Sequence, residues 1–185
     1  MRMKRIAVCA ACLLTAGCIP LSLNPLYTDD DLVYDAGLEG TWGEAPEQWA
    51  FEKAGENEYL LKVSEDEGRT TEFSVHLVQL KKHRFLDLQL SDRPDLSEWE
   101  MLHVIPAHTF WAFERDGDTL RLRNFDPEWL EDRVKNDRLW VPHTESNDFL
   151  VLTAGTKRLQ RFMLKWADDE EAMGDWEEMK RAPAK

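Results

Sequence analysis

The chain has 185 residues, with 36 acidic against 23 basic side chains and a formal net charge of −13 at pH 7. This length suits one domain with a single core, and so acidic a surface is repelled by nucleic acid and by anionic lipid head groups. We therefore expect no nucleic-acid partner and no basic patch that holds the protein on a membrane. All the cysteines lie within residues 1–18, so the rest of the chain forms no disulfide even in an oxidising compartment.

The first seventeen residues have the layout of a secretory signal. Basic side chains stand at positions 2, 4 and 5, an apolar run extends from Ile6 to Ala16, and Gly17 precedes Cys18. The apolar run is shorter than the roughly 20 residues that a helix needs to span a bilayer. A basic start and a small-residue end are typical of a signal peptide instead.

The segment Leu14-Thr15-Ala16-Gly17-Cys18 resembles the lipobox of bacterial lipoproteins. The resemblance implies that residues 1–17 are removed, and that Cys18 is acylated and becomes the first residue of the mature chain. A lipid anchor on Cys18 would then be the membrane partner. Because Ile19 rather than Asp follows this cysteine, resemblance to enterobacterial sorting implies the periplasmic face of the outer membrane.

Residues 18–36 are predicted to be the lipid-anchored tether. Pro20 and Pro25 disfavour a helix or a central strand in this segment. Fully extended, residues 19–31 would reach about 40 Å from the lipid. Leu21, Leu23 and Leu26 are apolar for a free linker, so we expect part of the tether to dock on the domain.

Residues 37–180 are predicted to form one β-rich domain. Apolar side chains alternate with polar ones around Leu61, Val75, Leu88 and Leu122, and a period of two is what a sheet with one buried face requires. Turn signals such as Asp116-Gly117-Asp118 separate these runs. Short strands at this spacing predict an antiparallel meander that closes into a barrel or a strongly bent sheet.

Helices are predicted in the later part of the chain. Asp126 is a natural N-cap with Pro127 at the first helical position, and this helix should end near Lys135. A second helix is expected over residues 156–167, with Leu159, Phe162, Met163 and Trp166 as its apolar stripe. Residues 149–153 between these helices read as a strand. Residues 168–180 suggest a further amphipathic helix, and residues 181–185 a frayed tail.

Gly40-Thr41-Trp42 resembles the Gly-x-Trp signature of lipocalins and related calycin barrels. The resemblance implies that Trp42 plugs one end of a barrel, while an ordinary place in the core is the alternative for this side chain. The expected fold is therefore mainly β (α+β): an antiparallel meander or a calycin-like barrel with a late helix and C-terminal helices.

No catalytic or cofactor-binding residue can be assigned from spacing. The candidate metal ligands are His103 and His108 together with His76, His83 and Asp87. They show no compact His-x-His or His-x-x-x-His pair, so we expect no metal and structural roles for the histidines. The serines lie in no Gly-x-Ser-x-Gly setting, and glycine-rich phosphate loops are absent from the sequence.

Aromatic side chains are concentrated between Trp99 and Trp140. Phe110 and Trp111 are adjacent, so in a strand they point to opposite faces, and one could be exposed to a partner protein or an apolar ligand. We therefore expect a non-enzymatic binding or interaction module in the bacterial envelope, with an apolar small ligand or an envelope protein as its partner. The alternative is a small envelope hydrolase or metal-dependent enzyme with an unrecognised site.

Overall fold

A computed structural model describes residues 19–65, 68–91, 96–101, 103–146 and 149–183. The signal segment and Cys18 lie outside the described residues, so cleavage and lipidation stay predictions. None of the helices in the described part of the chain has the length and apolar character needed to cross a bilayer.

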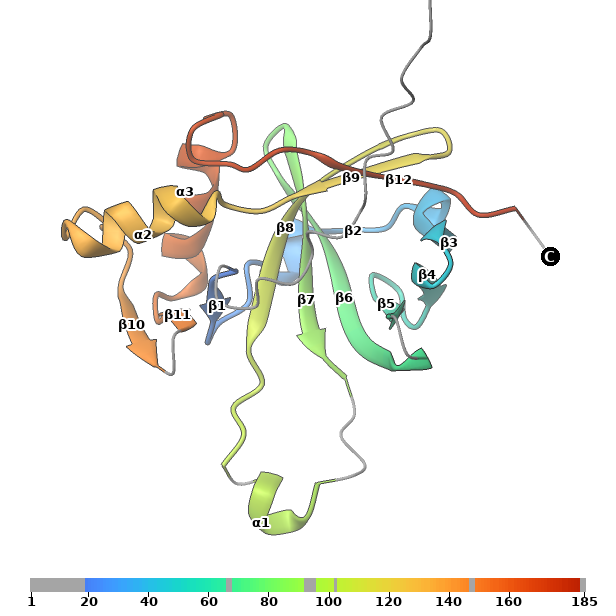
Figure 1. Cartoon of the computed structure of the whole chain (residues 1–185), viewed down its shortest axis with the longest axis horizontal. Helices are drawn as coiled ribbons and strands as arrows, with labels where there is room; N and C mark the ends of the chain where they lie inside the picture. The colour runs from blue at the N-terminus through green and yellow to red at the C-terminus, as the bar shows by residue number, and fades with distance from the viewer. Residues whose placement is uncertain (1–18, 66–67, 92–95, 102, 147–148, 184–185) are drawn as a thin grey trace, which may run out of the picture.

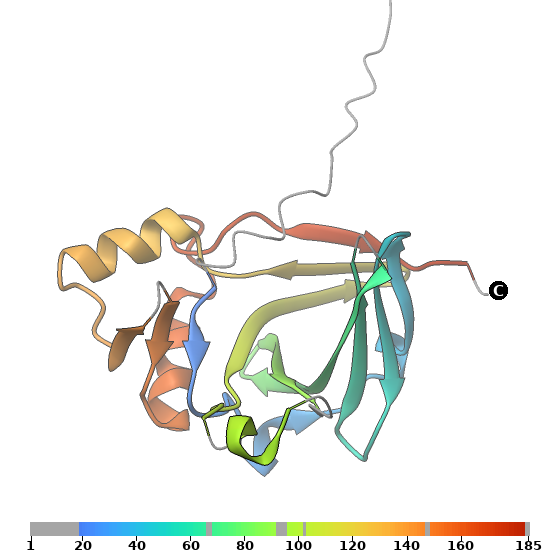
Figure 2. The same ribbon diagram turned by 60° about the horizontal axis from the view of Figure 1, so that its bottom comes forward.

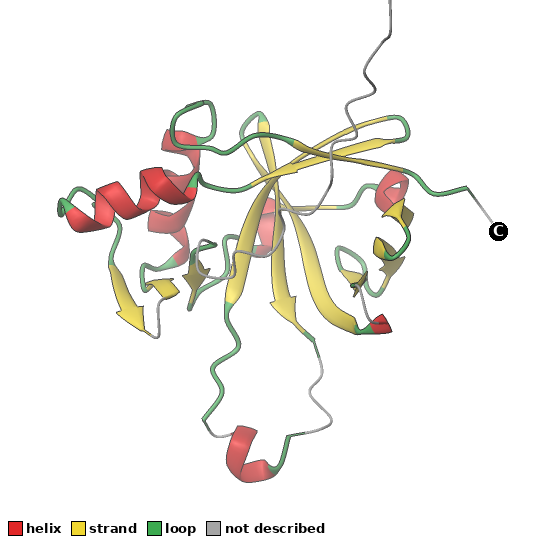
Figure 3. Ribbon diagram, viewed as in Figure 1, coloured by secondary structure: helices red, strands yellow, loops and turns green. Residues whose placement is uncertain are grey.

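The centre of the fold is the predicted antiparallel meander. Seven strands pair in chain order, each with the next, and Figure 3 shows them as the main body of the structure. They are β3 (Gly40–Glu44), β4 (Glu47–Lys53), β5 (Tyr59–Ser64), β6 (Thr70–Leu80), β7 (His83–Leu90), β8 (His108–Asp116) and β9 (Thr119–Arg123). The polar–apolar alternation thus predicted β5, β6, β7 and β9, and the spacing of these runs predicted the meander.

Shorter elements extend this meander into a mixed sheet. β1 (Leu21–Ser22) pairs in parallel with β11 (Phe149–Leu152) and antiparallel with β8, and β10 (His143–Ser146) pairs with β11. β2 (Leu32–Val33) pairs with β6. In the chain, β2 lies between two short 3-10 helices, η1 (Asp29–Asp31) and η2 (Ala36–Leu38). The described residues therefore form one twelve-stranded sheet with a parallel pair near one edge.

The sheet curls strongly but stays open. β12 (Glu177–Lys180) pairs with β9 at one end of the meander, and the chain after it reaches β3 at the other end (Figure 2). The two ends meet at a single bridge between Trp42 and Arg181 and at a 2.8 Å hydrogen bond from the amide of Ala182 to the carbonyl of Thr41. No continuous ladder joins β3 to β12 among the described residues, so the structure has a large open mixed sheet rather than a closed barrel.

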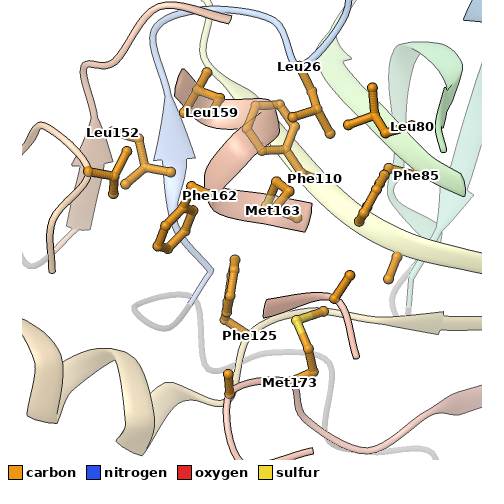
Figure 4. Close-up of a cluster of buried hydrophobic side chains, with 14 of the residues drawn as sticks. Leu26, Leu80, Phe85, Phe110, Phe125, Leu152, Leu159, Phe162, Met163 and Met173 are labelled. Atoms are coloured by element: carbon orange, nitrogen blue, oxygen red, sulfur yellow. The ribbon is translucent and has the colours of Figure 1, made fainter. Parts of the chain in front are cut away.

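Both faces of the central strands are buried. In β8, Phe110 and Ala112 point to one side, whereas Trp111 and Phe113 point to the other, and all of them are at most 8% exposed. We call the cluster inside the curl the inner core; it includes Trp42, Trp49, Phe51, Tyr59, Leu61, Leu77, Leu86, Trp111, Phe113 and Leu122. The cluster on the opposite face is the helix-side core, shown in Figure 4; it includes Leu26, Leu80, Phe85, Phe110, Phe125, Leu152, Leu159, Phe162, Met163 and Met173.

The two predicted helices cover the helix-side core. α2 (Pro127–Lys135) begins after Asp126, whose side chain accepts a 2.8 Å hydrogen bond from the amide of Trp129, as its N-cap position predicted. α3 (Thr156–Trp166) buries Leu159, Phe162 and Met163 on its apolar stripe. Both predicted helices are confirmed to within a residue at each end.

The C-terminal prediction is wrong in its element type. Residues 168–180 form turns and then β12 instead of an amphipathic helix, because the free edge of β9 supplies hydrogen-bond partners for Glu177–Lys180. Met173, at the spacing that suggested a helix, instead bridges to Phe125 in the helix-side core. The frayed tail is also corrected, since Arg181 and Ala182 hydrogen-bond to the chain around β3.

Candidate functional site

The segment that follows the predicted lipidation site is built into the domain. Pro20 is buried, residues 21 and 22 form β1, and the amide of Leu23 donates a 3.0 Å hydrogen bond to the carbonyl of Leu152. Leu26 has no exposed surface and lies in the helix-side core. The expected tether of residues 18–36 is therefore an integral part of the fold from residue 20 onward, and the boundary expected at residue 37 does not coincide with a break in packing.

A buried polar group ties this segment to the sheet. Asp87 is 1% exposed and His108 is 7% exposed, and His108 Nδ1 lies 2.6 Å from Asp87 Oδ1. Asp87 Oδ2 accepts a 2.7 Å hydrogen bond from the amide of Leu26. His108 Nε2 lies 3.2 Å from the side-chain amide of Gln89. Each polar atom of the pair thus has a neighbour within hydrogen-bonding distance in the protein.

This Asp–His pair does not have the accessibility of a catalytic dyad. Ser22 is opposite His108 in the β1–β8 register, but it has no exposed surface and its hydroxyl donates to the carbonyl of Asn24 at 2.7 Å. A general base must reach a proton on a bound substrate, whereas the imidazole of His108 is 7% exposed and its Nε2 lies against the side-chain amide of Gln89. The arrangement supports a structural role for the pair.

The remaining candidate metal ligands are dispersed. His76 stacks on Tyr27 with ring centroids 4.5 Å apart, His83 lies 3.3 Å from Asp168, and the imidazole of His103 contacts the carbonyl of Trp99 at 2.6 Å. Burial lowers the pKa of His76, although the nearby charges of Glu58 and Asp87 oppose this shift. Within the described ranges, no group of three or more His, Cys, Asp or Glu side chains is placed to hold a metal ion.

Trp42 is fully buried at the end of the inner core. Its indole nitrogen donates a 2.8 Å hydrogen bond to the carbonyl of Leu38, and the guanidinium of Arg181 lies 4.1 Å from its ring centroid. Arg181 also donates to the carbonyls of Gly37 and Glu39. The sequence identified Trp42 but not Arg181, which lies in the segment expected to be frayed.

A small hollow of about 150 Å³ lies between β7, β8 and the end of α3. It is lined by basic side chains, but these have partners: Lys82 Nζ is 2.8 Å from Asp168, and Arg123 donates to the carbonyl of Ala167 and stacks on Trp176. The hydrogen bond from Lys82 lowers the pKa of Asp168. Lys82 and Asp168 therefore neutralise one another, whereas the buried Nε of Arg123 has no hydrogen-bond partner among the described residues.

The most exposed apolar surface lies on the connection between β7 and β8. Within this connection, residues 91–107, the structure describes α1 (Glu98–Met101), which lies beyond the ends of both strands (Figure 1). Trp99 is 77% exposed and Ile105 is 70% exposed. A shallow, open hollow of about 500 Å³ beside them is lined by Leu96, Trp99, Glu100, His103 and Val104. We call Trp99, Ile105 and this hollow the apolar tip.

Local hydrogen bonds fix the apolar tip. The hydroxyl and the amide of Ser97 donate to Glu100 Oε2 at 2.7 and 2.8 Å, and the amide of Glu100 donates back to the Ser97 hydroxyl at 3.3 Å. This reciprocal pair is a capping box. The hydrogen bond from the Ser97 hydroxyl, reinforced by the one from its amide, lowers the pKa of Glu100 and keeps a carboxylate on the rim of the hollow.

The sequence located the aromatic-rich region but not which side chain is exposed. Phe110 and Trp111, the pair expected to expose one member, are 3% and 8% exposed because helices cover one face of β8 and the curled sheet covers the other. Trp99 is exposed because it lies outside the sheet. A signal was present: residues 91–107 form an unusually long connection for a meander and contain a Trp and an Ile without alternation.

Comparison of the chain with protein-family models, with curated proteins and with solved structures finds no match.

Proposed function

We propose that this protein is a lipid-anchored, non-enzymatic docking module of the bacterial envelope, held at the periplasmic face of the outer membrane through Cys18. The observation that carries the docking role is the exposure of Trp99 and Ile105 on a projecting, locally capped connection. Trp99 shares an exposed hollow with Leu96 and Val104, and contiguous exposed apolar surface is typical of interaction sites. Tryptophan is also the residue most enriched among interface hot spots.

The charge around the apolar tip indicates the chemistry of the partner. Among the described residues, the hollow is lined by the carboxylate of Glu100, which is held by hydrogen bonds from Ser97. A complementary surface would present an apolar side chain surrounded by basic ones, since complementary charge speeds association and selects the partner. We propose a protein segment of this kind as the occupant of the hollow.

The inner core supports docking at the surface over capture of an apolar ligand inside the sheet. Aromatic rings fill its interior: Trp49 of β4 meets Trp111 of β8 edge to face at 6.1 Å, and Phe51 meets Tyr59 on the neighbouring strand edge to face at 6.3 Å. A lipocalin-type ligand would need that volume. We propose that the curled sheet is an open variant of the calycin-like barrel, with Trp42 closing one end and its interior filled by side chains.

The lipid anchor is tested by the mass of the protein extracted from membranes. The mature chain should begin at Cys18 and carry lipid, and Cys18→Ser should leave an unprocessed, unlabelled precursor. A Cys18→Ser protein that is still processed and labelled with fatty acid would refute the anchor.

Docking is tested by placing a photoreactive amino acid at position 99 in cells. We expect one discrete adduct from position 99 and none from position 138, where Arg138 is also exposed but lies far along the chain after α2. Adding Ile105→Asp should weaken binding by about 30-fold, the loss of about 2 kcal/mol that is typical of a hot spot. Equal adducts from positions 99 and 138, or no effect of Ile105→Asp, would contradict this role.

A further inference from the structure

The segment between the predicted anchor and the sheet is too short to act as a flexible linker. Only two peptide units separate Cys18 from Pro20, a reach of about 7 Å at full extension. Pro20 is buried, and residues 21 and 22 are strand residues between β8 and β11. Further along, Asn24 donates to the carbonyl of Ala154 at 3.1 Å, and Thr156 donates to the carbonyl of Pro25 at 2.9 Å.

The register of β1 determines where the chain leaves the sheet. β7 pairs with one edge of β8, so β1 and β9 both pair with the other edge. On that edge Ser22 is opposite His108, and Arg123 is opposite Ala112. Because β1 is antiparallel to β8, the residues that precede Ser22 run along β8 toward Ala112 and the end of β9. Ile19 packs against the inner core, which contains Trp111. The chain must therefore leave the sheet beside the end of β9.

The apolar tip lies in the opposite direction along β8. The described residues 103–107 lead into β8 at His108, the residue that faces Ser22. Figure 1 shows α1 beyond one end of β7 and β8, with β9 and β12 across the other end. Residues preceding Ser22 move away from the tip by about 3.3 Å each.

From these placements we propose that the domain sits on the bilayer in one fixed orientation, with the end of β9 toward the membrane and the apolar tip pointing away from it. The partner of the tip is then a protein on the aqueous side rather than the lipid that holds the anchor. This inference rests on the proposed lipidation of Cys18 and adds the direction in which the docking surface faces.

Charge argues against the alternative that the apolar tip inserts into the same bilayer. Glu100 lies on the rim of the hollow with its pKa lowered by the hydrogen bonds from Ser97. A carboxylate taken into a bilayer pays a large desolvation cost.

The orientation can be measured with the lipidated protein in vesicles of phosphatidylethanolamine and phosphatidylglycerol that carry a head-group quencher. The native cysteines all lie in residues 1–18, so a cysteine introduced downstream is the one free thiol of the processed chain. Trp99→Cys places a fluorophore at the tip. Asp175→Cys places one near the proposed membrane side, because Asp175 is exposed and the amide of its neighbour Gly174 donates to the carbonyl of Asn124 at 2.9 Å.

We expect strong quenching at position 175 and little at position 99. A flexible Gly-Ser insertion between Cys18 and Ile19 should reduce the quenching at 175 by adding slack. Quenching at 99 that equals or exceeds that at 175 would overturn the orientation and favour insertion of the tip into the bilayer. A protein whose intact mass lacks lipid on Cys18 would instead refute the anchor, and the orientation with it.

Discussion

The carboxylate of Asp87 accepts a hydrogen bond from the backbone amide of Leu26 at 2.7 Å, across 61 positions of the sequence. The same carboxylate contacts the imidazole of His108 at 2.6 Å. One buried acid thereby holds the segment after the predicted anchor against the centre of the sheet. This contact is one reason why that segment is a strand and a core element rather than a free linker.

Asp87→Asn should destabilise the domain by about 1–3 kcal/mol, because the amide cannot accept from both buried donors and one of them loses its acceptor. The measurement is the denaturant midpoint at neutral pH. Asp30→Asn is the matched control, since Asp30 is exposed in η1. An equal midpoint for the Asp87 and Asp30 variants would show that the buried pair contributes nothing to folding.

Arg181→Ala should cost about 1–3 kcal/mol, since it removes the cation above Trp42 and leaves the carbonyls of Gly37 and Glu39 without their donor. Trp42 should also become accessible to a collisional quencher. Arg138→Ala, at an exposed position, should change neither property. Loss of stability without any change in Trp42 accessibility would argue that Arg181 acts elsewhere than on this ring.

Phe162→Ala should lower the free energy of unfolding by about 3–5 kcal/mol. Phe162 has no exposed surface and packs on Phe125 and Trp140 with centroids 5.1 and 5.7 Å away. Arg161→Ala on the exposed side of the same helix is the control. A melting temperature that does not move for Phe162→Ala would place α3 away from the helix-side core.

Acid should destabilise the domain in part through His76. Burial lowers its pKa below the ordinary value of 6.5. The imidazole of His76 therefore binds a proton more readily in the unfolded chain than in the folded domain. The contribution of His76 to the free energy of unfolding is fully present above about pH 6.5 and decreases as the pH falls through and below that value. Unfolding measured from pH 7.5 to 5 should lose part of its pH dependence in His76→Gln but not in His103→Gln. An unchanged slope in His76→Gln would contradict the assignment.

Local patterns in the sequence predicted much of this fold. Alternation predicted the strands from β5 to β7, and the Asp126-Pro127 start predicted α2, because caps and side-chain periods are properties of neighbouring residues. The role of residues 21 and 22 could not be predicted in this way. They form a strand only because β8 and β11 offer partners 86 or more positions away, as in the pairing of Ser22 with His108.

The same limit applies to the candidate site. The alternation of residues 86–90 predicts that Asp87 faces solvent. In the structure Leu26 and α3 cover that face of the sheet. Met173, Trp176 and Met179 have helical spacing, but long-range contacts recruit them: Met173 bridges to Phe125 and Met179 pairs with Leu120. Trp99 is exposed because it lies outside the sheet, and the length of residues 91–107 without alternation is the one local sign of this.

Docking through the apolar tip is tested most directly by thiol labelling of Ile105→Cys and Arg138→Cys proteins, each compared in native envelope membranes and after purification. Both positions are exposed in the domain alone. A partner on the tip should slow maleimide labelling at position 105 several-fold in membranes and leave position 138 unchanged. Labelling of position 105 that is equally fast in both preparations would show that nothing docks there, and would contradict the proposed function.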